Sequence, residues 1–148
     1  MGFGRLLSTT DIAASGLAAE RLRMEIAANN IANVHTTSTP EGGPYRRQQV
    51  QFSSEMAQSL GADAAAIAES LGGVQVNGVV RDETELPTVF NPGHPDADAD
   101  GFVKMPNVKL PMEMVDLMTA SRAYDANLKS LTMFKQMAEQ ALSLMSAR

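Results

Sequence analysis

The last quarter of the chain constrains the fold most. From Pro111 to Ala147 there is no glycine, and the only proline stands at the first position, where a helix tolerates it. Apolar side chains recur there at spacings of four and three residues, which is the pattern of a coiled-coil face. The series is Leu117, Tyr124, Leu128, Leu131, Ala138, Leu142 and Met145, with Ser121 and Lys135 filling the gaps. We therefore expect one long helix over residues 111–147.

A second helix is predicted over residues 11–34, which contain no proline and a single glycine, Gly16. Thr10 or Asp11 is the expected N-cap, because either side chain can accept a hydrogen bond from the first turn. The apolar positions form two stripes, so this helix should have packing partners on more than one side. One stripe holds Leu17, Met24 and Ile31, and the other holds Ala19, Leu22 and Ile26.

Residues 35–110 have the opposite character, because six of the seven prolines fall there. Short runs of β-favouring residues predict strands at residues 45–52, 74–81, 85–90 and 102–105. Residues 59–71 fit either a short helix or a flexible loop. The expected fold class is mainly α with a small β element, in which the helices 11–34 and 111–147 form a coiled-coil-like pair and one assembly domain. Residues 35–110 form an irregular or β middle region.

Charge and composition exclude several classes of function. The chain has 12 basic and 17 acidic residues, and six of the acids lie in residues 82–100 without a lysine or arginine. The remaining 12 basic and 11 acidic residues nearly balance, so no nucleic-acid-binding surface is expected. The absence of cysteine excludes disulfides and thiolate metal sites. No apolar run is long enough for a cleavable secretory signal or a membrane span, so neither conventional secretion nor membrane insertion is expected.

One short motif suggests metal chemistry. Residues 96–101 read DADADG, which matches the first half of an EF-hand calcium loop. The second half fails, because Asn107 stands where a bidentate glutamate is needed and Lys104 occupies another ligand position. A small calcium-responsive binding module that uses the loop from Asp96 to Asp100 is therefore the alternative function, and an acidic solvated turn is the simpler interpretation.

Signatures of catalysis are missing from the sequence. The two histidines, His35 and His94, are far apart and have no metal-binding spacing, and neither a nucleophile elbow nor a phosphate-binding loop is present. We therefore expect a protein that is not an enzyme, with no catalytic residues, no cofactor and no metal site.

Two stretches resemble a known family. Residues 27–37 read AANNIANVHTT, which is similar to the N-terminal signature of bacterial flagellar rod and hook proteins, where an A-x-N-N-I-A-N helix end precedes a threonine. Residues 91–108 together with residues 113–127 are similar to the proximal-rod members of that family. The chain length agrees with the proximal-rod members. Phe102 is a departure, because the family usually has tyrosine in the D-G-Y-V turn.

The resemblance implies a structural protein of the flagellar basal body. Members of this family leave the cell through the flagellar type III export apparatus without a cleaved signal peptide. They polymerise helically through their terminal helices into the rod, the drive shaft that crosses the periplasmic space. The expected partners are therefore other copies of the chain, other proximal and distal rod subunits and the export apparatus. The acidic turn at residues 96–100 belongs to the family pattern.

The resemblance and the helix periodicity together suggest which residues meet at the assembly interface. In this hypothesis the stripe of the first helix packs on the face of the last helix within or between subunits, and the asparagines satisfy backbone groups where the first helix ends. The expected interface residues are Leu17, Met24, Asn29, Asn30, Ile31, Asn33, Glu113, Leu117, Arg122, Tyr124, Asn127, Leu128 and Leu131.

Overall fold

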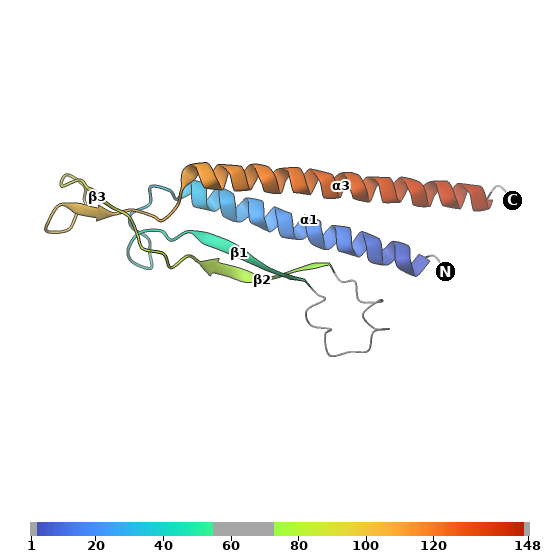
Figure 1. Ribbon diagram of the computed structural model, residues 1–148, viewed down its shortest axis with the longest axis horizontal. Helices are drawn as coiled ribbons and strands as arrows, with labels where there is room; N and C mark the ends of the chain where they lie inside the picture. The colour runs from blue at the N-terminus through green and yellow to red at the C-terminus, as the bar shows by residue number, and fades with distance from the viewer. Residues whose placement is uncertain (1–2, 55–72, 147–148) are drawn as a thin grey trace, which may run out of the picture. The chain divides into compact units, whose positions relative to one another are not determined.

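The computed structural model describes residues 3–54 and 73–146, with side chains at residues 10–53 and 73–144. The described residues form two long helices and two small sheets, which confirms the expected fold class (Figure 1). In chain order the elements are α1 (Phe3–Ala32), β1 (Gln48–Ser54), β2 (Val74–Arg81), β3 (Thr88–Phe90), β4 (Phe102–Lys104) and α3 (Leu110–Ser146).

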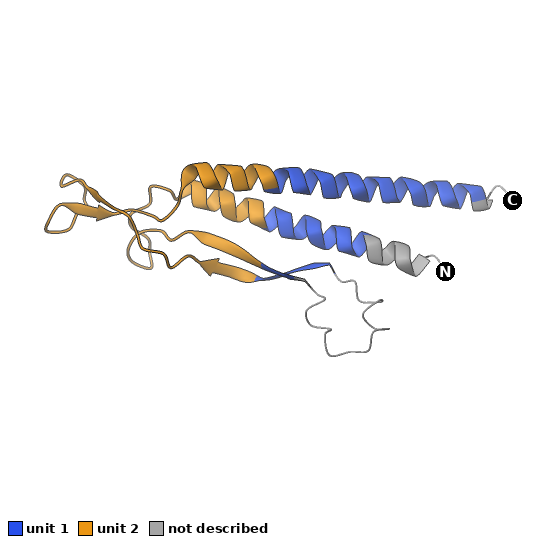
Figure 2. Cartoon of the chain, in the orientation of Figure 1, with its two compact units in different colours: residues 1–22, 52–77, 120–148 blue, residues 23–51, 78–119 orange. Residues whose placement is uncertain are grey.

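The chain divides into two compact units, shown in blue and orange in Figure 2. Unit 1 consists of residues 1–22, 52–77 and 120–148, and unit 2 consists of residues 23–51 and 78–119. Each unit therefore takes one segment of each long helix and one part of the strand pair β1 and β2. The predicted division into a terminal-helix domain and a middle region stays a prediction.

The bounds of both helices are close to those expected, except at the start of α1. This helix begins at Phe3, so the predicted N-cap at Thr10 or Asp11 is wrong. Residues 3–10 contain no proline, and extending a helix that is already nucleated adds one hydrogen bond for each residue fixed. Its end at Ala32 is capped locally, because the Asn33 side-chain amide donates to the Asn29 carbonyl at 2.9 Å.

The strands form two separate two-stranded sheets, β1 with β2 and β3 with β4. The strand at residues 74–81 is confirmed, whereas β1 begins at Gln48 rather than at Tyr45. The reason lies at Arg47, whose backbone N–H donates to the Asn107 side chain at 2.8 Å. In the second sheet Val89 pairs with Val103 in antiparallel register, and both strands are shorter than predicted. The segment 59–71 lies outside the described residues.

Helix α1 has neighbours on more than one side in each unit, as its two apolar stripes predict. In unit 1 the Val74 backbone N–H donates to the Ser15 hydroxyl at 3.1 Å, and a Cβ at Gly16 would lie 3.0 Å from the Asn127 side chain. In unit 2 Arg23 forms an ion pair with Asp116 of α3. Among the α1 residues whose side chains are described, the exposed ones are Asp11, Ile12, Ala14, Ala18, Arg21, Glu25, Ala28, Asn29 and Ala32.

The least exposed face of α3 differs from the predicted one. Leu128 and Leu142 are 42% and 51% exposed, so they lie outside the face of α3 that is covered within the chain, and their assignment to an assembly interface stays a prediction. The covered positions keep the four-and-three spacing but include small and polar side chains, which an apolar pattern does not detect. They are Glu113, Leu117, Ala120, Tyr124, Asn127, Leu131, Phe134 and Ala138. Ala120 and Ala19, both in unit 1, are fully covered, and small side chains allow helices to approach closely.

Candidate functional site: a buried polar cluster in unit 2

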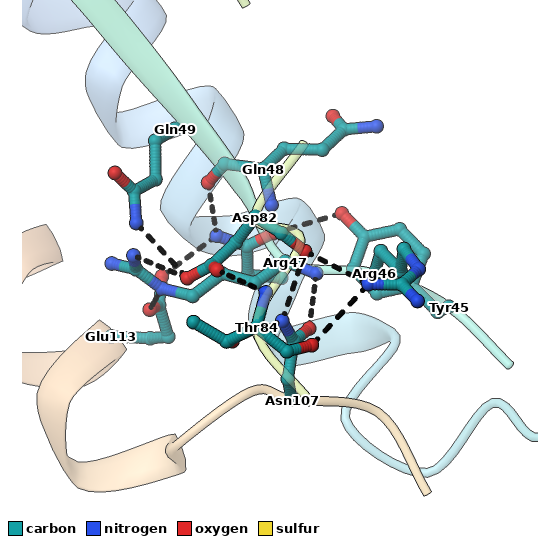
Figure 3. Close-up of polar contacts among 10 residues, drawn as sticks. Tyr45, Arg46, Arg47, Gln48, Gln49, Asp82, Thr84, Asn107 and Glu113 are labelled. Atoms are coloured by element: carbon teal, nitrogen blue, oxygen red, sulfur yellow. Dashed lines mark hydrogen bonds and ion pairs between the residues drawn. The ribbon is translucent and has the colours of Figure 1, made fainter. Parts of the chain in front are cut away.

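The most specific arrangement of side chains in unit 2 is a polar cluster, which we define as Asn30, Tyr45, Arg47, Gln48, Asp82, Thr84, Asn107 and Glu113 (Figure 3). Asn30 lies in the last turn of α1, and Glu113 lies in the first turn of α3. The other members come from β1, the segment before it, and the loops that follow β2 and β4. The cluster therefore joins the end of one helix, the start of another and a strand.

Asn30 is the centre of the cluster and is 1% exposed. Its side-chain oxygen accepts from the Tyr45 hydroxyl and from the Gln48 backbone N–H, both at 2.9 Å. Its side-chain nitrogen donates to the Gln48 carbonyl at 2.9 Å and to the Glu113 carboxylate at 2.8 Å. An asparagine amide has two donor hydrogens and two acceptor sites, so all four are used. The Asn30 amide therefore bonds both the backbone N–H and the backbone carbonyl of Gln48, the first residue of β1, as a paired strand would.

Glu113 is the second buried polar residue and is also 1% exposed. One carboxylate oxygen accepts from Asn30, and the other accepts from the Arg47 Nε at 2.5 Å. A buried carboxylate is tolerated only when it is paired and hydrogen-bonded, and both conditions are met. Its place in the first turn of α3 adds a favourable interaction with the helix dipole.

Asn107 and Asp82 complete the cluster on its other side. The Asn107 side-chain oxygen accepts the Arg47 N–H at 2.8 Å, and its nitrogen donates to the Asp82 carbonyl at 3.1 Å and the Thr84 hydroxyl at 2.9 Å. The Asp82 carboxylate accepts the Thr84 backbone N–H at 2.9 Å. Hydrogen bonds from the backbone and side chain of Thr84 lower the pKa of Asp82 below its ordinary value, and Arg47 contributes further.

The pKa of Tyr45 is raised above its ordinary value. Burial of its phenol is the main cause, and the negative charge of Glu113 acts in the same direction. The neutral hydroxyl is the form that donates to Asn30. The hydrogen bonds among Asn30, Gln48 and Glu113 fix the end of α1, the start of β1 and the start of α3 relative to one another.

Comparison with known proteins identifies the family. Residues 99–144 match the family model "Flagellar basal body rod FlgEFG protein C-terminal", and residues 11–38 match "Flagella basal body rod protein". The chain is 42% identical to the flagellar basal-body rod protein FlgC of Salmonella typhimurium, over 94% of this chain and 97% of that protein. It belongs to the FlgC family of flagellar basal-body rod proteins. FlgC proteins of Borreliella burgdorferi and Bacillus subtilis are 39% and 34% identical, over 95% and 90% of this chain and 97% and 94% of their own.

The structure of this FlgC-family chain divides the predicted interface residues of α1 into two groups. Asn30 lies inside the polar cluster, whereas Asn29 is exposed. Asn33 donates to the backbone and side-chain oxygens of Asn29, and its own oxygen accepts from the Thr36 hydroxyl. Asn29 and Asn33 therefore close the helix end within the chain. The apolar residues predicted for this interface are half-buried; they are Leu17, Met24 and Ile31.

On α3 the predicted residues also differ in their surroundings. Glu113 is enclosed by the polar cluster, and Leu117, Tyr124, Asn127 and Leu131 are partly covered. Arg122 and Leu128 are exposed, so their side chains are accessible to a neighbouring subunit.

Sequence reasoning missed six members of the cluster: Tyr45, Arg47, Gln48, Asp82, Thr84 and Asn107. A signal was present, since Glu113 belongs to the four-and-three series of α3 positions, most of which are apolar or small, and a carboxylate there requires a partner. The identity of that partner depends on contacts between residues 66 positions apart. No local pattern reports such a contact.

The acidic turn does not gather its carboxylates around one point. Asp98 accepts the backbone N–H groups of Asp100 and Phe102, and Asp96 accepts the Thr37 hydroxyl at 2.7 Å. Within the described ranges no group of three or more acidic or histidine side chains is arranged to hold a metal ion. The described helices also include none long and apolar enough to cross a bilayer. No observation on these residues favours the calcium-responsive module.

Proposed function

We propose that this chain is a structural subunit of the flagellar basal-body rod and carries out no catalysis. In the assembled rod it contacts further copies of itself and other proximal and distal rod subunits. Membership of the FlgC family supports this proposal. The structural observation that supports it is the set of exposed apolar side chains on α3.

The distribution of apolar side chains is unusual for an isolated protein. Among the described residues the buried hydrophobic ones are only Ala19, Ala27, Val103, Val108 and Ala120. Helix α3 meanwhile exposes many large apolar side chains: Leu110, Met112, Met114, Val115, Met118, Leu128, Met133, Met137, Leu142 and Leu144. Burial of apolar surface is the main driving force of association, so an extended apolar surface is expected to be covered by a partner. Methionine suits such a surface, because its flexible side chain adapts to different neighbours.

Assembly through these side chains is proposed to be helical. Residues 11–34 and 111–147 would act together as the rod core domain, and residues 35–110 as the middle region. The contacts join different surfaces of successive subunits, which produces a filament rather than a closed ring. The exposed residues Asn29, Arg122 and Leu128 are suited to contact neighbours directly. The enclosed residues Asn30 and Glu113 would act indirectly, by holding α1 and α3 in register within unit 2.

The proposal extends to location and delivery. The rod position implies the periplasmic part of the basal body, reached through the flagellar type III export apparatus without a cleaved signal peptide. Family membership supports this route.

Two leucines three residues apart on α3 provide a matched test. Leu128 is exposed and Leu131 is half-buried. Leu128→Asp should leave the isolated chain folded, because the charge stays in water, but should prevent assembly by placing a carboxylate in an apolar contact. Leu131→Asp should destabilise the isolated chain itself, by about 3 kcal/mol.

The measurement is mass spectrometry of purified basal bodies from a deletion strain that carries each variant, with circular dichroism of the isolated proteins. The wild-type chain should remain with detergent-washed rods, and Leu128→Asp should be absent from them despite a wild-type spectrum. Intact rods that contain Leu128→Asp at wild-type level would contradict the assigned surface. Intact rods that lack the wild-type chain would contradict the proposed function itself.

A further inference from the structure

The methionines whose side chains are described fall into two groups by exposure. Five are between 51% and 65% exposed, and all five lie on α3: Met112, Met114, Met118, Met133 and Met137. Met24 of α1 and Met105, which follows β4, are half-buried. An oxidant must reach the sulfur atom before it can react, so exposure separates the two groups chemically.

Methionine is also the only sulfur-containing residue type in the chain, because cysteine is absent. A two-electron oxidant such as hydrogen peroxide therefore meets no thiol that would react first. In the reaction a sulfur lone pair attacks one peroxide oxygen, the O–O bond breaks and an S–O bond forms. The products are methionine sulfoxide and water, so the sulfur loses two electrons and the peroxide gains them.

Four of the exposed methionines form two pairs at a spacing of four residues. Met114 and Met118 lie in unit 2, and Met133 and Met137 lie in unit 1. Side chains four residues apart lie on the same face of a helix, so each pair places two thioethers together. Leu110 lies one further step of four before Met114 and is also exposed. Oxidation would therefore place polar sulfoxides within apolar surface in both units.

The fold within each unit does not depend on these five side chains. None of them belongs to the polar cluster, and none is among the buried residues described. In the free chain the sulfoxide oxygen stays in water. Within an apolar contact it would need a hydrogen-bond partner that the contact does not offer. Oxidation should therefore act on association and leave the helices intact.

We propose that the five exposed methionines of α3 are a modification site, at which a peroxide oxidant forms methionine sulfoxide and thereby keeps the chain from joining the rod. This inference rests on the proposed function, because it concerns contacts that the α3 surface makes on assembly. The half-buried Met24 and Met105 take no part. Methionine sulfoxide reductases restore the thioether, so the block is reversible.

The first experiment tests the site itself and does not depend on assembly. The isolated chain is treated with hydrogen peroxide, and each methionine is followed by peptide mass spectrometry. The five exposed residues should gain oxygen faster than Met24 and Met105, while the circular dichroism spectrum stays unchanged. Equal rates in the two groups would overturn the assignment of the site. Loss of the helical spectrum during the reaction would overturn the separation of association from folding.

The second experiment tests the effect on assembly by competition between two chains in a deletion strain. Wild-type chain is expressed together with a variant that carries Met112→Leu, Met114→Leu, Met118→Leu, Met133→Leu and Met137→Leu. Leucine keeps the apolar volume and has no sulfur to oxidise. Dilute hydrogen peroxide during assembly should shift the ratio in rods about tenfold toward the variant, which is the scale of one unpaired polar group in a contact. General damage to the cell affects both chains equally.

The matched control carries Met24→Leu and Met105→Leu, and its ratio to the wild-type chain should not respond to peroxide. If peroxide leaves the ratio of the five-leucine variant unchanged as well, the effect on assembly is overturned. Both chains are then present in rods, so the proposed function stands. Rods that contain neither chain would contradict the proposed function and this inference with it.

A measurement on the wild-type chain alone does not depend on how well the variants assemble. Chains recovered from rods that formed in peroxide should carry less sulfoxide at the five positions than the unassembled chains of the same cells. Equal sulfoxide content in the two pools would show that oxidised chains join the rod freely, which overturns the proposal.

Discussion

Unit 2 and unit 1 are built from segments of the same two helices, yet they are stabilised in different ways. In unit 2, two fully buried polar side chains, Asn30 and Glu113, are satisfied by partners from three other segments. In unit 1, Ala19 and Ala120 are the buried hydrophobic residues among those described, and α3 turns Met133, Met137 and Leu144 toward solvent. Unit 2 thus adds a buried network of specific hydrogen bonds to its buried residues Ala27, Val103 and Val108, whereas the buried hydrophobic residues described in unit 1 are both alanines.

This difference indicates where specificity and association are located. A buried amide tolerates few alternatives, because each unpaired donor or acceptor costs free energy. Unit 2 therefore defines a register through contacts within the chain. Exposed methionine and leucine impose no such restriction, so the α3 segment of unit 1 is suited to be completed by neighbouring subunits.

The largest effect is expected from Asn30→Asp, which breaks the centre of unit 2. The new carboxylate would face Glu113 at the present 2.8 Å contact and would lose both donor hydrogens. We expect the free energy of unfolding to fall by about 4 kcal/mol in urea denaturation, as for other buried uncompensated charges. The matched control is Asn29→Asp, since Asn29 is exposed and its side chain only accepts a hydrogen bond, from Asn33. Equal losses in both variants would show that the cluster is not what stabilises this region.

Tyr45→Phe removes a single hydrogen bond and compares the two units directly, because the chain has one tyrosine in each. The Asn30 oxygen would lose the Tyr45 hydroxyl, and we expect a loss of about 1 kcal/mol. Tyr124→Phe in unit 1 should change stability much less, since within the described residues its hydroxyl has no hydrogen-bond partner.

The raised pKa of Tyr45 adds a check on the alkaline side. The pKa of Tyr45 in the folded chain lies above the ordinary value of 10.0. The stability that its neutral hydroxyl contributes is therefore fully present below pH 10.0 and is lost as pH rises through the folded-state pKa. An ultraviolet titration of the Tyr124→Phe chain should therefore show tyrosinate appearing above pH 10.0. Ionisation at or below the ordinary value would contradict the burial of this hydroxyl.

Asp82 is expected to change the stability of the chain less than Tyr45 does, and in the acidic rather than the alkaline range. Its pKa is lowered in the folded chain, so its contribution is present above the ordinary value of 3.8 and is lost as pH falls through the folded pKa. Asp82→Asn should accordingly reduce the drop in stability between neutral pH and pH values below 3.8. The measurement is the urea midpoint of both proteins across that range. Parallel curves for the two proteins would exclude a role for this carboxylate.

The smallest effect is expected from Glu139→Gln in the unit 1 segment of α3. Among the described residues Glu139 pairs with Lys135 alone, at 3.9 Å and with both side chains largely in water. Such pairs contribute about 0.3 kcal/mol, so thermal denaturation should be nearly unchanged. A loss comparable with that of Tyr45→Phe would mean that unit 1 also depends on specific polar contacts.

The helical part of the fold follows from local sequence. The segment 111–147 lacks glycine and internal proline, and α3 occupies nearly that range. Strand β2 was likewise predictable, because its valines lie in a short run that is bounded by turn residues. The family signatures were also readable directly, since they are contiguous stretches at the ends of the two helices.

The sequence by itself therefore determined the two helices, most of the strands and the family, because each depends on neighbours along the chain. The tertiary structure decided which face of α3 is covered, because Glu113, Ala120 and Asn127 occupy that face and only contacts from distant segments make such residues suitable there. It also decided that Asn30 and Glu113 act inside the chain rather than at its surface. The physical reason is that a hydrogen bond depends on distance in space, and Arg47 and Glu113 are 66 residues apart in sequence but in contact in the fold.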